Sequence, residues 1–121
     1  MTAPGWIAVG LLGGVAAAAR FLIDAEIAAR VETPFPLGIL AINLSGAFAL
    51  GLVAGASLHG QVLVIVAGGG IGSFTTFSTW ILDSHRLREA GLGRAAWLNV
   101  GFSLVAGFLA VSLGHWLGGI L

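Results

Sequence analysis

Apolar residues fill four long stretches of the chain, and short polar segments separate them. The stretches cover about residues 6–23, 37–58, 62–82 and 95–117. A helix that crosses a membrane needs about 20 predominantly apolar residues, so each stretch is long enough to span a bilayer. The rest of the chain suffices only for the termini and three short connections. This pattern predicts one all-α transmembrane domain made of four helices over residues 1–121.

The composition agrees with a protein whose outer surface faces lipid. Hydrophobic residues make up 58% of the chain and charged residues 8%, whereas a soluble domain carries about 25% charged residues. The absence of cysteine excludes disulfides and thiolate metal sites. The formal net charge of zero gives no sign of a nucleic-acid partner.

The charged residues predict an orientation in the membrane. Four spans put the end of the first helix and the third connection on one side, and we expect residues 83–94 to form the longest and most polar loop. Those two places hold all five arginines: Arg20, Arg30, Arg86, Arg88 and Arg94. Positive residues in short loops favour the cytoplasm. Both termini are therefore predicted to be extracytoplasmic.

Most of the 20 glycines lie inside the apolar stretches. Small residues four positions apart allow helix backbones to approach closely in lipid. Each predicted span holds one such pair: Gly10/Gly14, Gly51/Gly55, Gly68/Gly72 and Gly114/Gly118. One pair in every span predicts a tightly packed bundle.

The third stretch is a poor continuous helix. Residues 68–72 contain four glycines, and residues 73–79 contain five hydroxyl side chains. Each glycine costs about 0.8–1 kcal/mol relative to alanine in a helix interior. We therefore predict a break near mid-membrane, where freed backbone groups must be buried in protein or line an ion path. A small anion could be held there by O–H and N–H donors and by the edges of phenylalanine rings, which carry a partial positive charge.

Other polar side chains also lie inside the spans, and their role is open at this point. Asn43 and Ser45 lie in the second span, and Asn99, Ser103 and Ser112 lie in the fourth. Each could make an interhelical hydrogen bond, worth about 0.6–2 kcal/mol, or could line a pathway. For the residues of the fourth span, packing is the commoner outcome.

Three motifs in these helices closely resemble the Fluc (CrcB) family of fluoride channels, and the resemblance covers the whole chain. The family's third-helix stretch Gly-Gly-hydrophobic-Thr-Thr-Phe-Ser-Thr-Phe is matched at seven of nine positions by residues 72–80. The second-helix pattern Pro-Leu-Gly-Thr-Leu-x-x-Asn is similar to residues 36–43. The first-helix Gly-Gly and arginine correspond to Gly13, Gly14 and Arg20.

The resemblance implies an antiparallel dimer in the bacterial cell (inner) membrane that exports cytoplasmic fluoride passively. It implies two narrow fluoride pores and a structural Na⁺ at the dimer centre, held by the backbone carbonyls of Gly72 and Thr75. Arg20 corresponds to a family arginine near the cytoplasmic vestibule. The residues that correspond to the pore are Asn43, Phe77, Thr79, Trp80 and Ser103.

The chain departs from the family pattern in ways that bear on its partner. Ile39 stands where the family usually has threonine, and Gly107 where some members carry serine. Trp80 replaces the second pore phenylalanine and adds an indole N–H donor. Five arginines on one side and none on the other disfavour insertion in both orientations. We therefore favour a heterodimer with a homologous, oppositely oriented subunit over a homodimer.

Two other functions remain possible on the sequence alone. A small multidrug exporter is also a four-helix antiparallel protein, but its chemistry needs a membrane-embedded carboxylate, and Asp24 and Asp83 both lie near span ends. A non-transporting membrane assembly protein would make the third-helix pattern incidental. An enzyme is disfavoured, because His59, His85 and His115 are scattered without a base or metal spacing.

Overall fold

The computed structural model describes all residues from 1 to 121 and contains only helices. In chain order these are α1 (Ala3–Arg30), α2 (Leu37–Gly55), α3 (Gly60–Leu63), the π-helix η1 (Val64–Ile71), α4 (Gly72–Phe74), α5 (Ser78–Glu89) and α6 (Gly93–Gly119). Four helical units are long and apolar enough to cross a membrane: α1, α2, residues 60–89 and α6. The predicted all-α membrane fold with a bent third span is confirmed.

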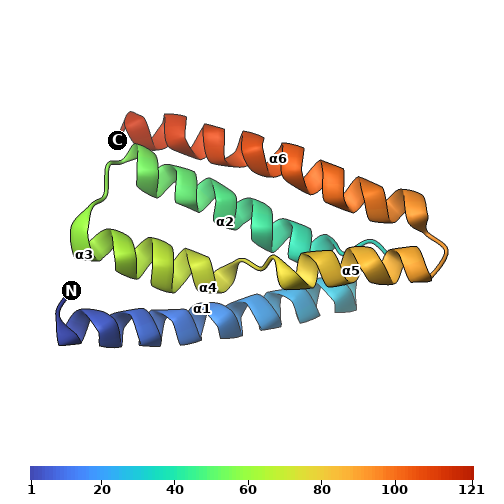
Figure 1. Cartoon of the computed structure of the whole chain (residues 1–121), viewed down its shortest axis with the longest axis horizontal. Coiled ribbons are helices and arrows are strands. Elements are labelled where there is room, and N and C mark those ends of the chain that lie inside the picture. Colours follow the sequence, from blue (N-terminus) through green and yellow to red (C-terminus); the bar gives the residue numbers. More distant parts are fainter.

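The four units lie lengthwise beside one another (Figure 1). The helix α6 packs along α2, and α1 packs along η1 and α4. Both termini lie at one end of the molecule, and the turn between α5 and α6 lies at the other (Figure 1). An even number of spans requires this placement of the termini.

The charged end of the molecule is more helical than its composition suggested. Residues 83–89 belong to α5, and only residues 90–92 connect α5 to α6, so the expected loop over residues 83–94 was wrong. Pairs of charged side chains one turn apart stabilise an exposed helix. Here Arg86 pairs with Asp83 at 3.6 Å, and His85 Nε2 lies 3.0 Å from a carboxylate oxygen of Glu89.

Two of the four glycine pairs bring α2 and α6 into backbone contact. A Cβ atom on Gly51 or Gly55 would collide with backbone atoms of α6, and one on Gly114 or Gly118 would collide with backbone atoms of α2. The pairs are therefore reciprocal, each helix using its small residues to admit the other. This is the packing expected of small residues four apart in a membrane.

The other two pairs do not pack within the chain. A Cβ on Gly10, Gly14 or Gly68 would meet nothing within 4 Å, and one on Gly72 would meet only the Ala67 carbonyl of its own helix. Within a single chain, close contact by a glycine pair is therefore found for α2 and α6 and not for α1 or the third unit. Other glycines serve there: Gly13 lies against Ser73 of α4, and Gly69 against Val9 of α1. In these two helices, spacing by four therefore did not identify the glycines at the contact.

The break in the third unit lies after the glycines rather than among them. Residues 64–71 form a π-helix, α4 continues to Phe74, and the chain then leaves the helix at Thr75, whose ψ is 161°. The helix resumes at Ser78. Wide π turns accommodate Gly68–Gly70 without ending the helix; such turns are frequent at functional sites.

Candidate ion pathway at the helix break

The break is held in place by the second helix. Asn43 of α2 donates from Nδ2 to the Thr76 carbonyl at 2.8 Å, and its Oδ1 accepts from the Thr76 amide at 2.9 Å. One side chain thus satisfies both backbone groups of a residue that has left the helix, as backbone buried in lipid requires. One turn further along α2, Gly46 makes room for the Thr75 side chain.

The same bond frees a carbonyl of the preceding helix. In a continuous α-helix the Thr76 amide would donate to the carbonyl of Gly72, but it donates to Asn43 instead. The amide of Thr79 would likewise donate to the Thr75 carbonyl, but it donates to the Thr76 hydroxyl at 3.3 Å. The carbonyls released from helical bonding therefore include those of Gly72 and Thr75.

Arg20 reaches the break from α1. Its Nη1 donates to the Thr75 carbonyl at 3.2 Å, and the side chain is half-buried. A positive charge thus lies next to the freed backbone. Arg20 lies two helical turns from Gly13, on the same face of α1, and Gly13 allows that face to approach Ser73 of α4. The family resemblance suggested that Arg20 lies near a vestibule. The structure shows in addition that Arg20 contacts the helix break.

A cavity of about 340 Å³ lies beside the break between α2, the break and α6. Four of the five predicted pore residues line it: Asn43, Phe77, Trp80 and Ser103. Thr75 and Thr76 line it as well. No acidic or basic side chain is among the lining residues, so its polarity comes from an amide, hydroxyls and backbone.

The aromatic pair at the cavity has an edge-to-face geometry. The rings of Phe77 and Trp80 lie 5.4 Å apart between centroids, with an interplanar angle of 77°. The Phe77 residue is 71% exposed, whereas Trp80 is only 9% exposed. Phe77 therefore presents its ring outward, and Trp80 forms part of the fixed wall.

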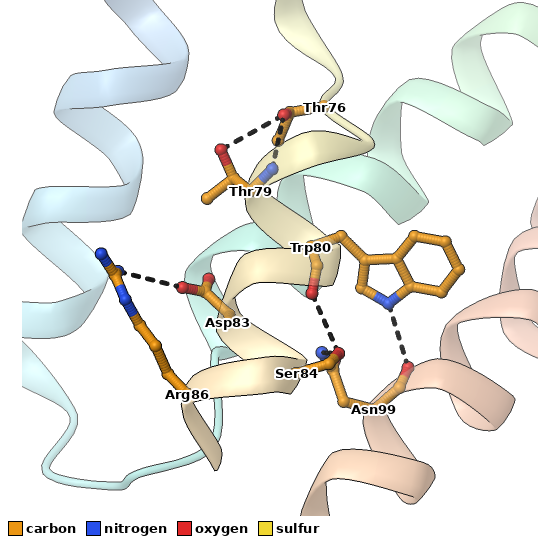
Figure 2. A network of polar contacts seen from close by, with 7 residues as sticks. All are labelled: Thr76, Thr79, Trp80, Asp83, Ser84, Arg86 and Asn99. Atoms are coloured by element: carbon orange, nitrogen blue, oxygen red, sulfur yellow. Dashed lines mark hydrogen bonds and ion pairs between the residues drawn. The ribbon is translucent and has the colours of Figure 1, made fainter. Parts of the chain in front are cut away.

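The indole N–H of Trp80 does not serve as an extra donor in the cavity. Its Nε1 donates to the backbone carbonyl of Asn99 on α6 at 3.3 Å (Figure 2). The expectation that tryptophan adds a pore donor was wrong, because the buried N–H needs a partner and finds one on α6. The indole contributes its ring surface to the cavity.

Thr79 does not line this cavity. Its Oγ1 accepts from the Thr76 hydroxyl at 3.3 Å, and its amide donates back to that hydroxyl (Figure 2). Both bonds lie in the first turn of α5, where a threonine hydroxyl can satisfy a free amide. The structure places Thr79 at the start of α5 rather than in the cavity wall.

Sequence reasoning overlooked Thr76 as a member of this site. Its bonds to Asn43 run through its backbone amide and carbonyl, and backbone roles leave no residue-type signature. The pair of threonines at the end of the glycine-rich stretch was the only available signal.

Comparison with known proteins agrees with these features. Residues 7–115 match the family model described as CrcB-like protein, Camphor Resistance (CrcB). The chain is 42% identical over 110 residues to fluoride-specific ion channel FluC 2 of Mycolicibacterium paratuberculosis, covering 91% of this chain and 90% of the relative. It is 40% identical over 119 residues to FluC 1 of Symbiobacterium thermophilum, covering 93% and 96%.

The fold and the break define a small multi-pass membrane protein with a part-polar cavity beside an interrupted helix. The family match and these identities then specify it further: the chain belongs to the CrcB family. The resemblance noted in its motifs is confirmed. These relatives are ion channels by name and not enzymes.

Proposed function

We propose that the chain is a subunit of a fluoride-selective channel that lets cytoplasmic fluoride leave a bacterial cell passively. The observation that carries this proposal is the cavity at the helix break, which gathers Asn43, Phe77, Trp80 and Ser103 from three segments of the chain. The names of the relatives supply the ion, since each is a fluoride-specific channel.

The cavity offers the chemistry that a small anion needs. A selective pore must replace the hydration shell with convergent ligands and still release the ion. The Asn43 amide has two hydrogens, of which one is used on Thr76; the second is left to donate to an anion. The Ser103 hydroxyl, whose bond to Asn99 Oδ1 is long at 3.5 Å, and the positive edge of Phe77 are further weak ligands. Several weak ligands favour passage over tight binding.

Arg20 adds favourable electrostatics although it does not itself line the cavity. A charge in a low-dielectric environment acts over several ångströms, and Arg20 lies against the carbonyl of Thr75, which lines the cavity. An anion near the break is therefore stabilised by a fixed cation. No carboxylate lines the cavity, which disfavours the small multidrug exporter, whose mechanism needs one.

A single chain leaves this pathway open at the side, and we propose that a second subunit completes it in antiparallel orientation. Phe77 is largely exposed, and the glycines at positions 10, 14 and 68 are uncovered. Uncovered small residues are suitable for close helix packing in lipid. Four of the five arginines lie at the end of α1, in α5 and at the start of α6, and Figure 1 shows these segments at the end opposite the termini: Arg30, Arg86, Arg88 and Arg94. This bias favours one fixed orientation, with both termini outside the cell.

A fixed orientation favours a homologous paralogue over a second copy as the partner. The relatives include chains numbered FluC 1 and FluC 2, which agrees with paired subunits. Cysteine labelling tests the orientation, because the chain has no native cysteine. A cysteine at Leu121 should react with an impermeant thiol reagent in intact cells. Equal populations of reactive and protected termini would contradict the fixed orientation.

The residues present are compatible with the proposed structural Na⁺. The carbonyls of Gly72 and Thr75 are both released from helical bonding, as hard oxygen ligands for a cation need to be. The Thr75 carbonyl also accepts from Arg20, but a carbonyl oxygen has two lone pairs. Two carbonyls per chain require a second subunit to complete the shell. The bound cation would offset the cost of an anion in low dielectric.

The first test is fluoride efflux from liposomes, measured with an ion-selective electrode for the chain alone and together with a FluC paralogue. We expect rapid fluoride release with chloride retained, most strongly in the mixed reconstitution. Equal loss of both anions, or no efflux in either reconstitution, would overturn the proposal. Replacing Na⁺ by N-methylglucamine on both sides should lower the rate if the cation is structural.

A further inference from the structure

A fully buried polar cluster lies between α5 and α6, directly behind the cavity wall. Asn99 is 1% exposed and Ser84 7%, and neither lines the cavity. Burying such groups is unfavourable unless each is hydrogen-bonded. No buried side-chain nitrogen or oxygen in the chain lacks a partner. The cluster is therefore a completed network.

The network is a closed circuit of three residues (Figure 2). The Ser84 hydroxyl donates to the Trp80 carbonyl at 2.9 Å and accepts from Asn99 Nδ2 at 2.8 Å. The Trp80 indole Nε1 then donates to the backbone carbonyl of Asn99 at 3.3 Å. The side chain of Asn99 thus bonds α6 to α5 through Ser84. The backbone carbonyl of the same residue accepts from the indole, so both bonds are made at one position of α6.

These three hydrogen bonds fix the orientation of the Trp80 indole ring relative to the cavity. The indole is anchored at its N–H, away from the cavity, so its ring is held in the wall beside Phe77. Asn99 Oδ1 also lies 3.5 Å from the Ser103 hydroxyl. We propose that Asn99 is a positioning residue that holds the Trp80 ring in the wall of the fluoride pathway, an inference that rests on the proposed function.

The test combines Asn99→Leu with Trp80→Phe and measures fluoride efflux in whichever reconstitution conducts. Leucine has a similar size to asparagine but cannot bond to Ser84. With Trp80 present, we expect Asn99→Leu to lower the efflux rate about tenfold, equivalent to about 1.4 kcal/mol. In the Trp80→Phe background, where no indole N–H exists, the same change should alter the rate by no more than about twofold.

A spectroscopic signature separates positioning from general stability. Replacing Trp6, Trp97 and Trp116, all exposed, by phenylalanine leaves Trp80 as the only tryptophan. Asn99→Leu should then shift its emission to longer wavelength, because the indole loses its fixed buried position. Ser112→Ala, which removes an exposed polar group from the same helix, is the matched control and should change neither emission nor efflux.

Each outcome decides between the two proposals. Equal losses from Asn99→Leu in both backgrounds, or an unchanged Trp80 emission, would overturn the positioning role while leaving the channel intact. No fluoride efflux from the unmutated protein in either reconstitution would overturn the proposed function and this inference with it. If Asn99→Leu does not fold, Ser84→Ala removes the same bond from α5 and is expected to give the same pattern.

Discussion

The contact of α2 with α6 and the contact of α2 with the helix break are made by opposite means. Along α6, α2 uses Gly51 and Gly55, and every added Cβ would collide with backbone. At the break, α2 uses Asn43, whose two hydrogen bonds replace those lost by Thr76. The same helix therefore contributes steric fit at one contact and polar satisfaction at the other.

This difference has a physical reason. In lipid, helix association gains little from apolar burial, so close backbone approach through small residues is an effective way to hold two unbroken helices together. An interrupted helix exposes amides and carbonyls that small residues cannot satisfy. A packed contact is rigid and dry, whereas a hydrogen-bonded break leaves spare donors. The second arrangement is the one that offers donors to an ion.

The largest effect is expected from a substitution that breaks the packed contact between α2 and α6. Gly118→Leu should prevent folding, because any side chain there meets the backbone at Leu52 and Ala56. The expected penalty exceeds about 3 kcal/mol, the upper range for overpacking. Loss of monodisperse protein in detergent is the measurement. Gly119→Leu is the matched control, since a Cβ on Gly119 meets nothing within 4 Å. Equal yields from both variants would contradict a packed contact.

The next largest effect is expected from a substitution of Asn43, whose consequences for stability and for fluoride efflux can be measured separately. Asn43→Leu leaves the amide and carbonyl of Thr76 unpaired, at about 1–3 kcal/mol for each group. We expect folded protein of lowered Tm whose fluoride efflux falls at least about 100-fold, since the change removes both the proposed ligand and the side chain that holds Thr76 in place. Ser45→Ala removes only a bond to Ile42 of the same helix and should conduct normally. Normal efflux from Asn43→Leu would contradict its role as a ligand.

A smaller effect tests the charge beside the break. Arg20→Gln weakens the bond to the Thr75 carbonyl and removes a cation, and hydrogen bonds to charged groups contribute about 1.5–3 kcal/mol. We expect efflux to fall about tenfold. Arg30→Gln is the control, because Arg30 pairs with Glu26 on the surface, where such pairs contribute about 0–1 kcal/mol. Similar efflux from both variants would show that the position of Arg20 does not matter.

The four helices were predictable from sequence because hydropathy and length decide whether a segment can span a bilayer. The end of α5 was not, because residues 83–89 look like a loop by composition, whereas they continue the helix with Ser84 and Leu87 buried. Within one chain, the glycine pairs of α2 and α6 make close contact and those of α1 and the third unit do not. Spacing shows which residues share a helix face, and it does not show which neighbour that face meets.

The candidate site was predictable from its motifs more than from its polarity. The resemblance identified Asn43, Phe77, Trp80 and Ser103, which the structure brings to one cavity. It did not reveal that the indole of Trp80 bonds to α6. It also assigned Thr79 to the pore; this residue lies in the first turn of α5 and is not among the residues that line the cavity. Hydrogen-bond partners depend on helix rotation, which a motif does not specify.

The sequence by itself determined that this chain crosses a membrane four times, that its third span is interrupted, and that its charges gather at one end. Those properties follow from local composition and from the cost of polar backbone in lipid. Only the tertiary structure decided where the helix breaks, which carbonyls it frees, and that Asn43 and Arg20 meet them. Such contacts join residues 33 and 55 positions apart, and the packing of whole helices determines them.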